Sequence, residues 1–189
     1  MRIVPTSLPG VVIIEPPVFE DPRGWFMESY NHRRFQDALA AAGLPVPGPF
    51  VQDNHSCSQR HVLRGIHFQL PPGAQGKLVR TVKGRVFDVA VDLRRSSPRF
   101  GHWTGVELTD ANRRQLWVPE GFGHGFLSLE DDTQVVYKTT GYWSKDHERV
   151  VAWNDPLIAI DWPLDTGVTA RLVARDADAP SLHLAECFA

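Results

Sequence analysis

A chain of 189 residues, 42% of them hydrophobic, is long enough to bury one core and too short for two. Its 20 basic and 22 acidic residues nearly balance, which argues against a general nucleic-acid or membrane-binding surface and leaves only local anion sites. Cys57 and Cys187 are too few for a disulfide framework. No apolar leader follows Met1 and no stretch reaches transmembrane length, so we expect a soluble cytoplasmic protein with one domain over residues 1–189.

The predicted elements are mostly strands, because apolar residues recur with a period of two. In the run RVFDVAVDL, one face carries the apolar residues Phe87, Val89, Val91 and Leu93, and the other carries Val86, Asp88, Ala90 and Asp92. Turn signals such as VKGR and LTDANR separate the runs. The other strand-like runs are residues 24–30, 50–56, 63–69, 76–82, 102–108, 113–119 and 133–140. This spacing predicts an all-β sandwich or barrel.

One helix is predicted early in the chain. Asn31 is suited to the N-cap, Phe35 and Leu39 share one face, and Gly43 is suited to the end. After Asp155 the chain is rich in Pro and Asp without periodicity. We therefore expect a small peripheral helix and, over about the last 35 residues, a less regular segment that packs on the barrel.

The segment PEGFGH, residues 119–124, matches PxGxxH, a signature of the cupin superfamily of double-stranded jelly rolls. Metal-binding cupins supply an HxH pair and a Glu from another strand, because a divalent ion needs three or four converging ligands. Here that strand reads His67, Phe68, Gln69. The ligand set is short, so we expect neither a metal nor another cofactor.

His67 and Gln69 share one face of their strand, opposite Ile66 and Phe68. If the two apolar side chains pack outward, His67 points into the mouth of the barrel. An isolated histidine is as readily a hydrogen-bonded core residue, and that interpretation stays open. Further polar side chains are expected around the same cavity, and cations inside a small barrel need polar or anionic partners. These side chains are Arg64, Lys77 and His124.

Many blocks along the chain resemble the motifs of the dTDP-4-dehydrorhamnose 3,5-epimerase family, in the family's order. They are DPRGWFMESYN, VQDNHSCS, VLRGIHFQ, GKLVR, VFDVAVDLRRSSPRFGHW, NRRQLWVPEGFGHGF, VVYKTTGYWS and WNDPLIAIDWP. The resemblance implies an all-β, cupin-type double-stranded β-helix without metal. It also implies a homodimer with strand exchange near residues 23–30, and a dTDP-4-keto-6-deoxyhexose as substrate.

Epimerisation beside a ketone requires a base, a donor or cation for the enolate oxygen, and an acid on the opposite face. His67 suits the base because imidazole titrates near neutral pH, and Lys77 suits the charged donor. The resemblance implies that Tyr137 is the acid and that Asp176 pairs with the histidine. Arg175 stands where the family has a lysine. A core-packed tyrosine is the alternative for Tyr137.

Other residues are expected to bind substrate. Arginine suits a diphosphate because its guanidinium offers a bidentate fork. The resemblance implies that the strand from Arg23 to Glu28 reaches the partner's nucleotide, and that an aromatic residue of the Tyr142–Trp143 pair stacks on the sugar or base. The full set is Arg23, Phe26, Glu28, Gln52, Asn54, Arg64, His124, Tyr142, Trp143 and Arg175.

The sequence leaves three classes of function to compare. The resemblance favours inversion at both C3 and C5 on the route to dTDP-L-rhamnose, but relatives that invert only C3 or only C5 share the same residues. A metal-dependent cupin isomerase or dioxygenase would need the missing ligands. A non-catalytic sugar-nucleotide binding module would not need His67, Lys77, Tyr137 and Asp176 together.

Overall fold

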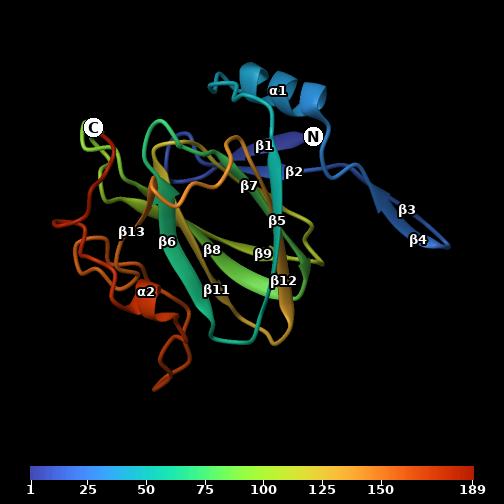
Figure 1. Cartoon of the computed structure of the whole chain (residues 1–189). Helices are drawn as coiled ribbons and strands as arrows, with labels where there is room; N and C mark the ends of the chain where they lie inside the picture. Colours follow the sequence, from blue (N-terminus) through green and yellow to red (C-terminus); the bar gives the residue numbers. More distant parts are fainter.

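Two facing β-sheets form the body of the molecule, which the computed structural model describes in full over residues 1–189 (Figure 1). The six-stranded sheet has the order β1 (Arg2–Pro5), β2 (Val12–Glu15), β10 (Gln115–Val118), β7 (Lys77–Lys83), β12 (Thr133–Thr139), β5 (Gln52–Ser58). The five-stranded sheet has the order β13 (Glu148–Val150), β6 (Leu63–Gln69), β11 (Phe122–Ser128), β8 (Arg85–Asp92), β9 (Trp103–Thr109). The strands within these two sheets pair antiparallel. The expected all-β, cupin-type jelly roll is confirmed.

The inner faces of the two sheets bury one apolar core. Val79 and Val135 of the first sheet lie in the same cluster as Val86, Ala90 and Phe126 of the second. Alternation in β8 is as predicted, since the face with Val86 and Ala90 points into the barrel and also carries Asp88. This core closes one end of the barrel, and polar side chains line the other end.

The outer face of the five-stranded sheet is covered by the C-terminal part of the chain (Figure 1). Ile66 and Phe68 of β6 pack outward against apolar residues such as Ile158 and Leu182. The short helix α2 (Ala174–Ala177) lies in this segment, beside β6. Because the segment packs on the back of β6, it can reach the edge of the barrel mouth.

The predicted helix forms as α1 (His32–Ala41), on the outer face of the six-stranded sheet. The Asn31 side chain accepts a hydrogen bond from the backbone N–H of Arg34, the expected N-cap contact. Phe35 and Leu39 are buried against the sheet, and Gly43 follows the helix with φ of +70°. Neither helix of the structure is long and apolar enough to cross a membrane.

A third, two-stranded sheet is the hairpin β3 (Val18–Asp21) and β4 (Gly24–Met27). It extends away from the body of the molecule (Figure 1). Phe19 and Phe26 are paired across the hairpin and are 61% and 68% exposed. So large an apolar surface on a projecting hairpin is typical of a segment that packs against another chain.

Candidate active site

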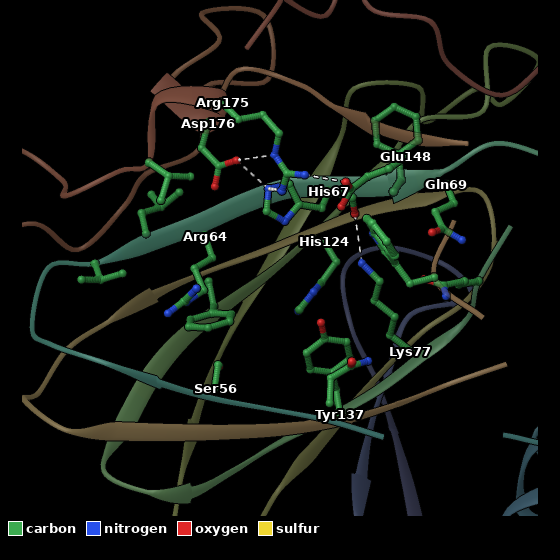
Figure 2. Close-up of a pocket in the computed structure, with 18 of the residues that line it drawn as sticks. Ser56, Arg64, His67, Gln69, Lys77, His124, Tyr137, Glu148, Arg175 and Asp176 are labelled. Carbon is green, nitrogen blue, oxygen red and sulfur yellow. Dashed lines mark hydrogen bonds and ion pairs between the residues drawn. The ribbon is translucent and has the colours of Figure 1, made fainter. Parts of the chain in front are cut away.

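A cavity of about 590 Å³ opens at the polar end of the barrel, between the two sheets. His67 on β6 and His124 on β11 lie directly opposite each other in register, so both imidazoles enter the cavity from one sheet. Lys77 and Tyr137, on the neighbouring strands β7 and β12, enter it from the other. Figure 2 shows these side chains converging from the two walls.

An irregularity in β6 lets Arg64 and His67 face the same cavity. Strict alternation would place them on opposite faces of the strand. The register with β11 shifts between these two positions, as in a β-bulge. Gly65 at the shift has φ of +131°, and a Cβ there would lie 2.5 Å from the Gly125 Cα. Only glycine fits this conformation and this close approach.

His67 and Asp176 form a hydrogen-bonded pair. Nε2 of His67 lies 2.7 Å from Oδ1 of Asp176, while the backbone N–H of Gly65 donates to Oδ2 at 3.2 Å. A carboxylate only accepts, so the imidazole hydrogen is on Nε2 and Nδ1 keeps its lone pair. Burial lowers the pKa of His67, although Asp176 opposes this shift. Burial alone would raise the pKa of Asp176, but the hydrogen bonds from His67 and the Gly65 N–H and the charges of His67 and Arg175 together lower it.

Arg175 lies over the same pair. Its Nη1 bonds Oε2 of Glu148 at 2.5 Å, and its Nη2 lies 3.1 Å from Nε2 of His67. Because Nε2 already directs its hydrogen to Asp176, the second contact places a positive charge beside the imidazole rather than adding a hydrogen bond. Figure 2 shows Arg175 and Asp176 on one side of His67, and His124, Lys77 and Tyr137 on the opposite side.

Lys77 is a buried cation at the floor of the cavity. Its Nζ donates to the backbone carbonyl of His67 at 3.1 Å. Burial lowers its pKa to about 8, against the opposing effects of the negative charges of Asp88 and Glu148. The ammonium is therefore still charged at neutral pH and is poorly solvated, which suits a donor to a developing negative charge.

Tyr137 lies beyond His124, with their ring centroids 6.4 Å apart. Burial raises the pKa of the Tyr137 hydroxyl, so it remains protonated at neutral pH. His124 is buried and its Nε2 lies 2.8 Å from Oδ1 of Asp88, which fixes this imidazole in place. The arrangement holds a potential acid across the cavity from the His67–Asp176 pair.

Most residues predicted from the sequence meet at this cavity. Those that line it are His67, Lys77, Tyr137, Asp176, Gln52, Asn54, Arg64, His124, Trp143 and Arg175. The others lie elsewhere in the single chain. Arg23 pairs with Asp21 on the projecting hairpin, Phe26 is exposed beside it, and Glu28 bonds Arg34 of α1. Tyr142 is 71% exposed and is not part of the cavity wall.

The sequence did not point to several residues of the cavity. An acid on the inward face of β8 was the available signal for Asp88, which holds His124. No local pattern distinguishes Ser56, Gln75 or Glu148, which line the cavity from three different segments. No group of three His, Cys, Asp or Glu side chains in the structure is arranged to hold a metal ion.

Comparison with known proteins places this geometry in a family. The sequence profile described as dTDP-4-dehydrorhamnose 3,5-epimerase matches residues 5–183. A protein of that name from Pseudomonas aeruginosa is 50% identical over 188 residues, covering 100% of this chain and 99% of the relative.

Solved structures agree over nearly the full length. An epimerase from Legionella pneumophila in complex with dTDP-4-keto-L-rhamnose has a TM-score of 0.90 and 44% identity, covering 97% of this chain and 93% of that one. A 3'-monoepimerase from Streptomyces bikiniensis in complex with dTDP-quinovose has a TM-score of 0.84 and 34% identity, covering 97% and 88%. This chain therefore belongs to the dTDP-4-dehydrorhamnose 3,5-epimerase family.

Proposed function

We propose that this protein epimerises dTDP-4-dehydro-6-deoxy-D-glucose at C3 and C5, giving dTDP-4-dehydro-L-rhamnose for dTDP-rhamnose biosynthesis. One observation carries the chemistry. A neutral imidazole held by Asp176, a buried ammonium at Lys77 and a protonated phenol at Tyr137 converge on one cavity. These are the base, the enolate donor and the acid that inversion beside a ketone requires.

The proposed proton path uses these three side chains. Nδ1 of His67 takes the hydrogen from the carbon next to the ketone, and the C–H electron pair moves to form an enolate. Lys77 stabilises the negative oxygen, and Asp176 stabilises the imidazolium. Tyr137 then gives its proton to the opposite face of the same carbon. His67 releases its proton to solvent and returns to neutral, and Tyr137 takes a proton from solvent, so the net reaction is inversion without redox change.

Hydrogen exchange in deuterated buffer tests this function. The substrate dTDP-4-dehydro-6-deoxy-D-glucose is incubated with the protein, and NMR reads the deuterium content at each sugar carbon. We expect label at both C3 and C5. No label at either carbon would contradict the enzyme assignment.

The relative from Streptomyces bikiniensis is described as a 3'-monoepimerase, and it shares this fold. Inversion of one centre is therefore the second candidate. Label at only one carbon, with a product inverted at that carbon alone, would establish this second function. The same NMR spectrum distinguishes the two cases.

The pH dependence of kcat/KM should be bell-shaped. The acid limb reflects His67, whose pKa lies below its usual value because of burial, so activity appears as the pH rises through that pKa. The alkaline limb reflects Lys77, whose ammonium is lost as the pH rises through about 8. Initial rates from pH 5 to 10 measure both limbs. Lys77→Arg stays charged, so its residual activity should lack the alkaline limb near pH 8. An unchanged alkaline limb in this variant would mean that another group causes it.

Replacing Tyr137 with phenylalanine should separate deprotonation from inversion. We expect kcat for product formation to fall about a hundredfold, at the lower end of the range for a general acid. Substrate hydrogen should still wash out, because His67 and Lys77 are intact. Tyr30→Phe, at a tyrosine that packs against α1, is the matched control. A wild-type rate in Tyr137→Phe would show that this residue packs in the core and is not the acid.

We further propose that the protein is a homodimer in which the β3–β4 hairpin crosses to the partner. The hairpin projects from the body, and Phe19 and Phe26 on it have no cover in the single chain. Arg23 at its turn is paired only with the neighbouring Asp21. Exchange of the hairpin would bury the two aromatic rings and bring Arg23 and Phe26 to the nucleotide end of the partner's cavity.

Arg23→Ala should raise KM about tenfold and change kcat little, because a contact to the nucleotide is made equally in the ground and transition states. Steady-state kinetics and light scattering check both parts. Arg33→Ala, on the exposed face of α1, is the control. A fully active monomer would contradict the exchanged hairpin.

A cytoplasmic location is also part of the proposal. Cys57 and Cys187 are both free thiols, and Cys57 is exposed. Exposed free thiols are typical of reducing compartments. Cell fractionation with an antibody to the protein tests the location.

A further inference from the structure

Three glutamine side chains hold the backbone of one short loop, residues 141–144, between β12 and β13. Gln75 donates to the Gly141 carbonyl at 2.6 Å. Gln69 donates to the Tyr142 carbonyl at 3.2 Å and accepts from the Ser144 N–H at 2.7 Å. Gln52 accepts from the Trp143 N–H at 3.0 Å. Every residue of the loop is thus tied to a glutamine.

The three glutamines come from separate segments. Gln52 begins β5, Gln69 ends β6, and Gln75 precedes β7. Gln69 is 4% exposed, and its Nε2 also donates to the Gly73 carbonyl at 2.5 Å. An amide suits this task because it offers donors and an acceptor to adjacent backbone groups. Gln69 stands two residues after His67, the position at which metal-binding cupins carry a second histidine.

The loop presents Trp143 to the cavity. Trp143 is part of the cavity wall although its side chain is half-exposed, whereas the neighbouring Tyr142 points away. The loop also lies at the Lys77 end, since Thr139 pairs with Lys77 and Gln75 is two residues before it. A fixed loop therefore places the indole near the proposed reacting end of the substrate.

We propose that Gln52, Gln69 and Gln75, together called the glutamine clamp, are positioning residues that hold Trp143 as a preformed wall for the sugar ring. This inference rests on the proposed epimerase function. The apolar C–H face of a deoxysugar packs on an aromatic ring, and a loop ordered before binding avoids the entropy cost of ordering it afterwards. Gln52 acts on Trp143 through its amide oxygen, while its Nε2 donates to Asn54 Oδ1 at 2.9 Å.

A double-mutant cycle tests whether the clamp acts through Trp143. Gln75→Met removes one clamp bond, while Thr139 Oγ1 still donates to the Gly141 carbonyl at 2.8 Å and preserves the fold. We expect KM to rise about tenfold with kcat within about threefold of wild type. In a Trp143→Ala background, Gln75→Met should have almost no further effect. Gln69→Met, which removes three bonds, should show the same pattern more strongly.

The matched control is Gln134→Met, at a glutamine outside the cavity that bonds only His55. It should leave both kinetic constants unchanged. If Gln75→Met raised KM by the same factor in the wild-type and Trp143→Ala backgrounds, the inference would be overturned. Calorimetry with dTDP alone tests whether Trp143 contacts the nucleotide or the sugar. We expect Gln75→Met to bind dTDP with unchanged affinity. A tenfold loss of affinity would assign the Trp143 wall to the nucleotide and overturn the sugar contact.

A readout independent of turnover separates this inference from the epimerase function. Protein labelled with 5-fluorotryptophan gives a fluorine resonance for Trp143, assigned by its absence in Trp143→Phe. We expect Gln75→Met to shift or broaden this resonance without substrate, and Gln134→Met to leave it unchanged. An unaltered Trp143 resonance in Gln75→Met would contradict the clamp, even if wild-type protein catalysed the exchange of both protons.

Discussion

His67→Asn should lose on the order of a hundredfold to ten-thousandfold in kcat, the usual range for a general base. Asparagine keeps a polar group in this space but has no group that accepts a proton at neutral pH. Its amide reaches about as far as Nδ1 and stops short of the Nε2 that bonds Asp176 at 2.7 Å, so the variant removes the base together with that hydrogen bond. Binding of dTDP should be close to that of wild type, because His67 is assigned to the sugar chemistry.

Two further variants test whether the loss in His67→Asn comes from removing the base. Asp176→Asn should cost less than His67→Asn, because it mis-orients the imidazole and weakens support of its protonated form without removing the base. His55→Asn, at an exposed histidine that bonds Gln134, should behave as wild type. Calorimetry with dTDP beside the kinetics separates lost catalysis from lost folding. If His67→Asn exchanged both substrate protons at the wild-type rate, the base would be another residue.

Lys77→Met should lower kcat about a hundredfold to a thousandfold, the cost of removing a preorganised donor to an oxyanion. Methionine keeps most of the length of the side chain, so the cavity floor stays filled. The loss has an electrostatic cause, because a buried ammonium with a pKa of about 8 is poorly screened by water. Both inversion and hydrogen wash-out should fall, in contrast to Tyr137→Phe, since the enolate itself loses its stabilising charge.

Lys138→Met is the matched control for this change. Lys138 is next to Tyr137 on β12 but points to the opposite face, where it bonds Asp53 at 2.9 Å. Its loss should leave kcat unchanged. Lys77→Met also leaves the buried carboxylate of Asp88 without a nearby cation, so thermal unfolding is measured in parallel. Wild-type wash-out in folded Lys77→Met would remove Lys77 from the mechanism.

The elements that depend on local pattern were predictable from the sequence. The α1 cap at Asn31 and the burial of Phe35 and Leu39 follow from short-range geometry. Most strands follow from period-two alternation, and the jelly roll follows from the resemblance and the PxGxxH segment. The elements outside the predicted runs are β1, β2, β3, β11, β13 and α2. The residue types that meet in the cavity were also indicated, since a histidine, a lysine and a tyrosine stand in motifs that carry chemistry.

Local pattern was sufficient for the type of the clearly periodic elements and for the chemical identity of the groups that they carry. The tertiary structure decided which groups meet. His67 and Asp176 are 109 residues apart, and only packing of the C-terminal segment on β6 joins them. The bulge at Gly65, where only glycine fits against Gly125, turns Arg64 into the cavity against simple alternation. Burial, a property of the whole fold, lowers the pKa of Lys77 to about 8.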